Sequence, residues 1–204
     1  MELYGGPEWF LTGTLPTTVG ALTELESLSV RGNTMTGSTP SELGSCDALS
    51  NLNLSQNRFY SRVPSELGML VQIESISMET NRLYGSLPTE IGQISTLRSL
   101  TISTNALTGE IVTEIGLLNE LRGFDCELNQ FSSTIPTEVG LLGNLTLFHM
   151  SGSGLKGRMP SEMGMLSSLQ SLQLRGNSLV SSIPSTFGRL SNLGKFDDVG
   201  QKAS

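Results

Sequence analysis

Apolar residues recur along the chain in seven columns that share a period of 24 residues. Across eight units only Thr39 and Asp198 interrupt these columns. A unit of this length cannot bury its own apolar face, so the units are expected to stack around one continuous core. In the first unit the columns begin at Leu11, Leu15, Val19, Leu22, Leu25, Leu28 and Val30.

Three further columns keep the same period. The glycines are Gly20, Gly44, Gly68, Gly92, Gly116, Gly140, Gly164 and Gly188. The prolines are Pro16, Pro40, Pro64, Pro88, Pro136, Pro160 and Pro184, with Val112 in the remaining slot. The asparagines are Asn33, Asn57, Asn81, Asn105, Asn129 and Asn177, with Ser153 in the remaining slot. We expect this asparagine ladder to satisfy buried backbone groups between coils.

Each unit contains a strand pattern followed by a turn pattern. Leu25-x-x-Leu28-x-Val30 alternates with a period of two, which predicts a short strand, and stacked copies would form a parallel sheet. The segment 36–44 then turns the chain, because proline fixes φ there. A hydroxyl column is expected to cap a helical turn that glycine ends. Its members are Ser41, Ser65, Thr89, Thr113 and Thr137.

Together these motifs resemble the plant-type leucine-rich repeat, L-x-x-L-x-x-L-x-L-x-x-N-x-L-x-G-x-I-P-x-x-L-G, over residues 10 to 196. The resemblance implies an α/β solenoid, a right-handed superhelix of about eight coils with a concave parallel β-sheet. Similar arrays occur in receptor-like ectodomains, polygalacturonase-inhibitor-like proteins and diatom proteins. The resemblance therefore favours an extracellular or cell-surface location and a protein or peptide ligand on the concave face. The Cys-paired end caps of the secreted plant proteins are absent.

The period divides the chain into one domain, 1–204, that starts inside a repeat. Residues 1–10 form a partial N-terminal repeat, and the last unit is degenerate. Since uncapped ends expose core, we expect the chain to be a fragment of a longer array. The predicted units are 11–34, 35–58, 59–82, 83–106, 107–130, 131–154, 155–178 and 179–202.

Charge and composition exclude several kinds of function. The chain has 12 Lys and Arg against 19 Asp and Glu, a net charge of −7, which argues against nucleic acid or an anionic membrane as partner. No basic signal-peptide start and no membrane-spanning apolar run are present. The G-x-G-x-x-G run at 152–157 follows from the repeat, so no cofactor is expected. Cys46 and Cys126 fall on core columns about three coils apart and predict free buried thiols, without a disulfide or a metal.

His149, the single histidine, is the strongest candidate for catalysis. Adjacent coils are expected to bring it beside Asp125, close enough to pair. A Ser-His-Asp triad needs a nucleophile in the next slot, which Gln173 occupies. An open sheet also supplies no oxyanion hole. We therefore predict no catalytic residue and no enzyme activity.

One region of the outward sheet positions departs from the small hydroxyl residues found elsewhere. Leu128 and Leu147 lie outside the core columns and are expected to be exposed among charged residues, as in a contact patch. Neutral drift in a degenerate repeat is the competing interpretation. A structural role toward a repetitive ligand, a cell-wall glycan or ice, is the alternative to peptide binding. The candidate ligand-binding residues are Glu79, Arg98, Thr101, Arg122, Asp125, Glu127, Leu128, Leu147, His149 and Arg175.

Overall fold

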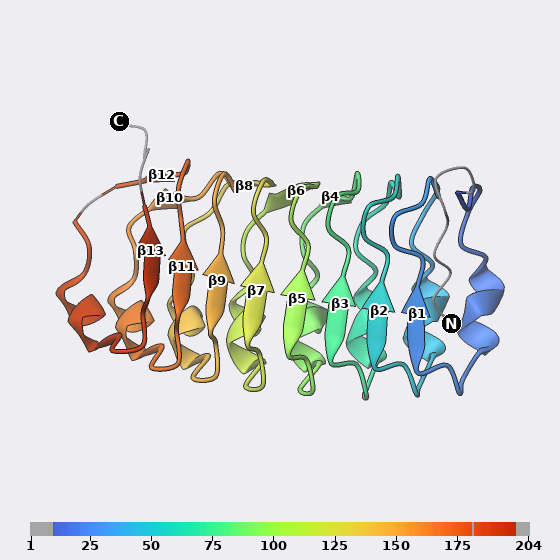
Figure 1. The fold of residues 1–204 in the computed structure, drawn as a ribbon, viewed down its shortest axis with the longest axis horizontal. Helices are drawn as coiled ribbons and strands as arrows, with labels where there is room; N and C mark the ends of the chain where they lie inside the picture. Colours follow the sequence, from blue (N-terminus) through green and yellow to red (C-terminus); the bar gives the residue numbers. More distant parts are fainter. Residues whose placement is uncertain (1–9, 181, 199–204) are drawn as a thin grey trace.

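The computed structural model describes residues 10–180 and 182–198, so the predicted partial repeat at 1–10 falls almost wholly outside the described residues. One parallel eight-stranded sheet runs the length of the molecule in the order β1-β2-β3-β5-β7-β9-β11-β13 (Figure 1). Its strands are β1 (Ser27–Ser29), β2 (Asn51–Asn53), β3 (Ser75–Ser77), β5 (Ser99–Thr101), β7 (Gly123–Asp125), β9 (Leu147–His149), β11 (Ser171–Gln173) and β13 (Lys195–Asp197).

The register of this sheet equals the sequence period. Leu28 pairs with Leu52, and Leu52 pairs with Ile76, so each residue faces the residue 24 positions away. In β2, β3, β5 and β7 the central residue is buried and the two flanking residues are partly exposed. One period therefore forms one coil, and the stacked parallel sheet confirms the predicted solenoid.

Short helical turns lie on the side of each coil opposite the sheet (Figure 1). All the described ones are five-residue 3₁₀ turns. They are η1 (Thr17–Ala21), η2 (Ser41–Ser45), η3 (Ser65–Met69), η4 (Thr89–Gln93), η5 (Thr113–Leu117), η6 (Thr137–Leu141), η7 (Ser161–Met165) and η8 (Ser185–Arg189).

The predicted hydroxyl capping of these turns is wrong. The residue at the N-cap is proline in η2 and η3 and Val112 in η5, and no side chain caps the turn. The hydroxyls lie inside the turn, at its first residue, so they cannot reach its free N–H groups. They donate instead to the neighbouring glutamate, as from Thr113 to the Glu114 carboxylate at 3.2 Å.

Two smaller parallel sheets follow the edge where the main strands end. One has the order β4-β6-β8 and the other pairs β10 with β12 (Figure 1). They are formed by β4 (Tyr84–Gly85), β6 (Ala106–Gly109), β8 (Gln130–Phe131), β10 (Lys156–Gly157) and β12 (Ser178–Leu179). This edge carries a second row of outward side chains besides those of the main sheet.

Asparagines bind adjacent coils together beneath this edge. The Asn57 side-chain oxygen accepts from the Met35 N–H at 3.0 Å, and its amide donates to the Val30 carbonyl of the preceding coil at 2.9 Å and to the Leu54 carbonyl at 3.2 Å. Ser153, in the same column, donates its hydroxyl to the Cys126 carbonyl at 2.8 Å. Each slot thus satisfies polar backbone groups that would otherwise be buried without partners.

The core is a single continuous cluster of apolar residues. Both cysteines lie in it, fully buried and free. The Phe124 and Phe148 rings stack within it at 5.9 Å between centroids. Among the described residues no helix is long and apolar enough to cross a membrane.

Glycine sets how closely the coils approach on the helical side. A Cβ on Gly116 would lie 2.6 Å from the Glu138 carbonyl oxygen of the next coil. Gly44, Gly68, Gly92 and Gly140 would meet the next coil in the same way, at 2.3–2.5 Å. No side chain fits at these positions unless the backbone of the adjacent coil moves.

Candidate functional site

The exposed face of the main sheet is most varied over β7 and β9. There, Asp125, Glu127, Leu128, Leu147 and His149 form what we call the β7–β9 patch. Register places Gly123 beside Leu147 and Asp125 beside His149. Leu128 and Leu147 are 59% and 44% exposed, respectively. Two apolar side chains therefore lie in solvent next to two acids and a histidine.

Leu128 owes its outward position to backbone geometry. Its φ is +53°, a left-handed conformation that Gln56, Thr80 and Thr104 share in the same slot of other coils. The Leu128 side chain leans over Gly152 of the next coil, where an added Cβ would lie 3.0 Å from its Cδ2. Glycine at that slot of the neighbouring coil thus leaves room for the leucine on the surface.

The two acids of the patch are held close together. The Asp125 carboxylate accepts from the Glu127 N–H at 3.1 Å and from the Ser103 hydroxyl at 3.2 Å. Burial raises the pKa of Asp125, and the Glu127 charge adds to the rise. One carboxylate oxygen of Glu127 is buried and has no hydrogen-bond partner among the described residues. The pair is a site of concentrated negative charge with unused acceptor capacity.

His149 makes contacts that sequence reasoning missed. Its Nε2 lies 2.9 Å from the Ser171 hydroxyl and 3.0 Å from the Gln173 amide nitrogen. Gln173 does occupy the adjacent register position, but a serine hydroxyl also reaches the ring, so the expectation that no nucleophile lies beside His149 is wrong. Ser171 was missed because it is two residues earlier on β11 and reaches diagonally across the strands.

The arrangement nevertheless differs from a catalytic triad. An amide N–H can only donate, so the contact with the Gln173 amide nitrogen requires Nε2 to accept. Gln173 competes with Ser171 for that one nitrogen, and Ser171 is only 9% exposed. Within the described part of the chain no hydrogen bond joins Asp125 to His149, and their expected pairing is limited to electrostatic attraction. The network fixes the histidine ring on the sheet surface.

The remaining predicted residues surround the patch at different distances. Thr101 lies directly beside Asp125 in the register. Glu79 and Arg175 share the slot of Glu127, each two coils away, or about 10 Å at strand spacing. Arg98 and Arg122 are exposed just before β5 and β7, and Arg98 forms an ion pair with Glu74 at 2.7 Å. The structure therefore gathers six of the ten candidates and leaves Glu79, Arg98, Arg122 and Arg175 at its margin.

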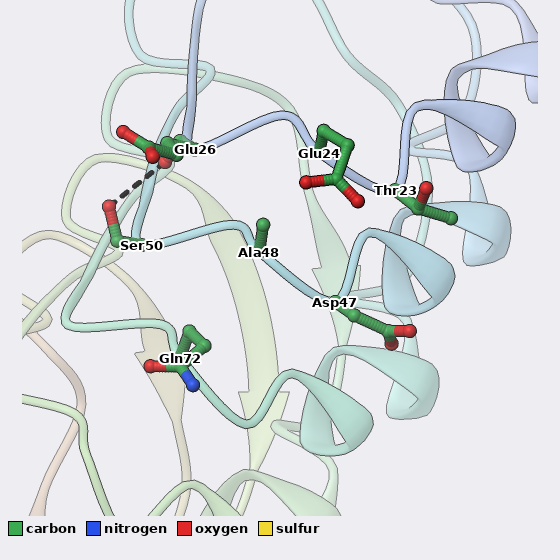
Figure 2. Close-up of a pocket in the computed structure, with 7 residues that line it drawn as sticks. All are labelled: Thr23, Glu24, Glu26, Asp47, Ala48, Ser50 and Gln72. Atoms are coloured by element: carbon green, nitrogen blue, oxygen red, sulfur yellow. Dashed lines mark hydrogen bonds between the residues drawn. The ribbon is translucent and has the colours of Figure 1, made fainter.

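An open hollow lies elsewhere, beside the loops that lead into β1 and β2 (Figure 2). Within it, the Ser50 hydroxyl donates to the Glu26 carbonyl at 2.9 Å. In the described ranges no group of three His, Cys, Asp or Glu residues is placed to hold a metal ion. The hollow is acidic and shallow and is separate from the patch. It is lined by Thr23, Glu24, Glu26, Asp47, Ala48, Ser50 and Gln72.

Comparisons with known proteins agree with this architecture. The family model for the Leucine Rich Repeat matches residues 24–46 and 168–190. No curated protein matches the chain in sequence. Among solved structures, the Arabidopsis thaliana receptor kinase ectodomain GASSHO1/SCHENGEN3, in complex with CASPARIAN STRIP INTEGRITY FACTOR 2, is 36% identical with a TM-score of 0.92. That match covers 95% of this chain and 23% of the receptor chain.

Two further structures are similar. The plant peptide hormone receptor RGFR1, in complex with RGF2, is 31% identical with a TM-score of 0.92, over 93% of this chain and 30% of that one. A plant ice-binding protein is 22% identical with a TM-score of 0.64, over 94% of this chain and 70% of that one, which shows the shared fold alone. The chain thus spans less than a third of either receptor chain.

Fold, repeat and comparisons together define a leucine-rich-repeat solenoid. The asparagine ladder, the proline and glycine columns and the receptor ectodomain neighbours all match the plant-type form of this repeat.

Proposed function

We propose that the chain is a non-enzymatic module that binds a peptide or a protein segment on the β7–β9 patch. The observation that carries this proposal is the pair of exposed leucines, Leu128 and Leu147, beside the acids Asp125 and Glu127. Binding energy concentrates in a few anchors, and small hydroxyl residues supply little of it. The rest of the sheet face is mostly serine, threonine and asparagine, so this patch is its strongest anchor region.

The similar receptor structures support this proposal through the ligands that are bound to them. Two of the receptor ectodomains were solved in complex with a peptide hormone or a named factor. By analogy, we place this chain outside the cell or at its surface, as part of a longer receptor-like array. The patch offers apolar contacts and carboxylate acceptors in an area suited to a few residues of an extended peptide.

The test uses peptides selected from a random linear library displayed on phage, with the intact chain as bait. Titration calorimetry then measures the affinity of a selected peptide for the wild type and for Leu147→Ala and Glu127→Lys. We expect each variant to weaken binding by about tenfold, or about 1.4 kcal/mol. Glu26→Lys is the matched control, because it makes the same charge change in the hollow of Figure 2. Unchanged affinity in both patch variants would rule out the patch.

A surface that binds ice or a repetitive glycan is the second candidate, because successive coils present a row of threonine hydroxyls. These hydroxyls are already engaged, since each donates to the adjacent glutamate carboxylate at 3.1–3.3 Å. We therefore expect no thermal hysteresis in solutions of the chain, and measurable hysteresis would favour ice binding over the peptide module. The row is Thr89, Thr113 and Thr137.

A further inference from the structure

A second surface carries aromatic and basic side chains on two consecutive coils, at the edge formed by β4. We call Arg58, Tyr60, Arg62, Arg82 and Tyr84 the Tyr–Arg patch. All five side chains are exposed, and they alternate with buried residues along the two segments. The segments run side by side, because the Tyr84 N–H donates to the Ser61 carbonyl at 3.0 Å.

The two tyrosines form a pair. Their ring centroids are 4.7 Å apart and their planes are inclined by 37°. Tyr60 is 63% exposed and Tyr84 is 37% exposed. Because the rings partly face each other, much of what they present to a partner is ring edge and hydroxyl. Ring edges carry partial positive charge, so this arrangement favours electron-rich partners.

The arginines concentrate positive charge around these rings. Arg58 and Arg82 occupy equivalent slots of adjacent coils, where like charges repel each other. Arg62 lies along the next coil, since a Cβ on Gly85 would be 3.2 Å from its Cγ. No ion pair between described residues involves any of the three. In a chain with a net charge of −7, this cluster stands out as a local site for negative charge.

We propose that the Tyr–Arg patch binds an acidic segment of a partner protein. Guanidinium groups bind carboxylates through paired, charge-assisted hydrogen bonds, and tyrosine hydroxyls add further donors. Tyrosine and arginine are also the residues most enriched where protein interfaces hold their binding energy. A glycan would need open ring faces for stacking, and the pairing of Tyr60 with Tyr84 covers part of them.

This surface is independent of the proposed peptide site. The Tyr–Arg patch lies on the two segments that follow β2 and β3, the second of which includes β4, at the edge of the solenoid. The β7–β9 patch lies on the face of the main sheet further along the array (Figure 1). A chain with both patches could hold a peptide and an acidic partner at the same time.

The test measures binding of fluorescein-labelled hexaglutamate to the intact chain by anisotropy. We expect saturable binding that weakens about tenfold in Arg58→Ser/Arg82→Ser, which removes charge-assisted contacts. The matched control is Lys156→Ser/Arg158→Ser. These exposed residues lie four coils away, in the slots of Tyr60 and Arg62, and their replacement changes the net charge equally. Circular dichroism confirms that both variants are folded.

Other outcomes overturn the proposal. Absence of saturable binding to hexaglutamate would do so, and so would an equal loss in the two double variants, which would mean non-specific charge attraction. Binding of trigalacturonate without binding of hexaglutamate would assign the patch to an acidic glycan. Concentration-dependent dimerisation in sedimentation velocity, abolished by Arg58→Ser/Arg82→Ser, would assign it to a second copy of the chain.

Discussion

Replacing Gly116 with alanine tests whether glycine sets the coil spacing. The added Cβ would lie 2.6 Å from the Glu138 carbonyl oxygen and 2.8 Å from the Glu138 Cβ. An ordinary contact is about 3.4 Å or longer, so the two coils would have to separate by roughly 0.8 Å. That is about a sixth of the spacing between neighbouring strands. No change of rotamer can relieve the clash, because one partner is backbone and the other is fixed to it.

Overpacking of a dense interior costs about 1–3 kcal/mol, and a clash with backbone belongs at the upper end of that range. We therefore expect Gly116→Ala to lower the free energy of unfolding by about 3 kcal/mol. With a urea dependence of about 2 kcal/mol per molar, the unfolding midpoint falls by about 1.5 M. Because solenoid coils can unfold separately, hydrogen exchange should show the loss of protection first in η5 and η6.

Gly188 provides the matched control, since it occupies the same slot in η8 and an added Cβ would meet nothing within 4 Å. Gly188→Ala should leave stability unchanged or raise it by about 0.5 kcal/mol, through the lower entropy of the unfolded chain. Urea unfolding followed by circular dichroism compares the two variants. Midpoints that agree within error would refute the idea that glycine is required by the close approach of the coils.

Three further predictions concern buried polar groups. Asn129→Ala should cost about 2–4 kcal/mol in urea unfolding, because the Leu107 N–H, now 3.0 Å from the Asn129 oxygen, would be buried without a partner; a cost below about 1 kcal/mol would contradict this. The raised pKa of Asp125 means that the native state holds its proton more tightly, so its contribution to stability falls as pH rises above 3.8. Asp125→Asn should remove that fall, so its stability relative to wild type should increase as the pH rises above 3.8. An equal pH dependence in both proteins would refute this. Burial raises the pKa of the Cys126 thiol well above its usual range, and Cys46 is also buried, so a thiol reagent should modify neither until urea unfolds the chain.

The repeat made most of the fold predictable. Apolar residues at seven fixed offsets determine which side of each coil is buried, and the register of β1 with β2 repeats that offset of 24 residues. The exposure of Leu128 and Leu147 could be inferred because the equivalent positions of the other units hold mostly polar or small residues, which is typical of a position that faces outward. An apolar residue in a column that is otherwise polar therefore indicates a candidate contact residue on the surface.

Contacts that run diagonally between coils were not predictable from the columns. The hydrogen bond between His149 and Ser171 joins positions 22 residues apart, and side-chain torsions decide whether it forms. The ring contact between Tyr60 and Tyr84 joins positions that are 24 residues apart, in a slot outside the core columns. A search for aromatic residues one period apart in exposed slots would have found it. The 3₁₀ form of the turns depends on hydrogen-bond geometry that the sequence pattern does not express.

Because the main sheet keeps one register throughout, the number of coils between two positions sets the distance between them along the array. Because each residue pairs with the one 24 positions away, a duplication or loss of one whole period would leave every pairing in place. Inserting a coil between two contact residues would move them apart by one strand spacing, about 4.8 Å, without changing how either is presented. Gene rearrangements in steps of 24 codons would therefore alter the length of ligand that the surface can span while preserving its chemistry.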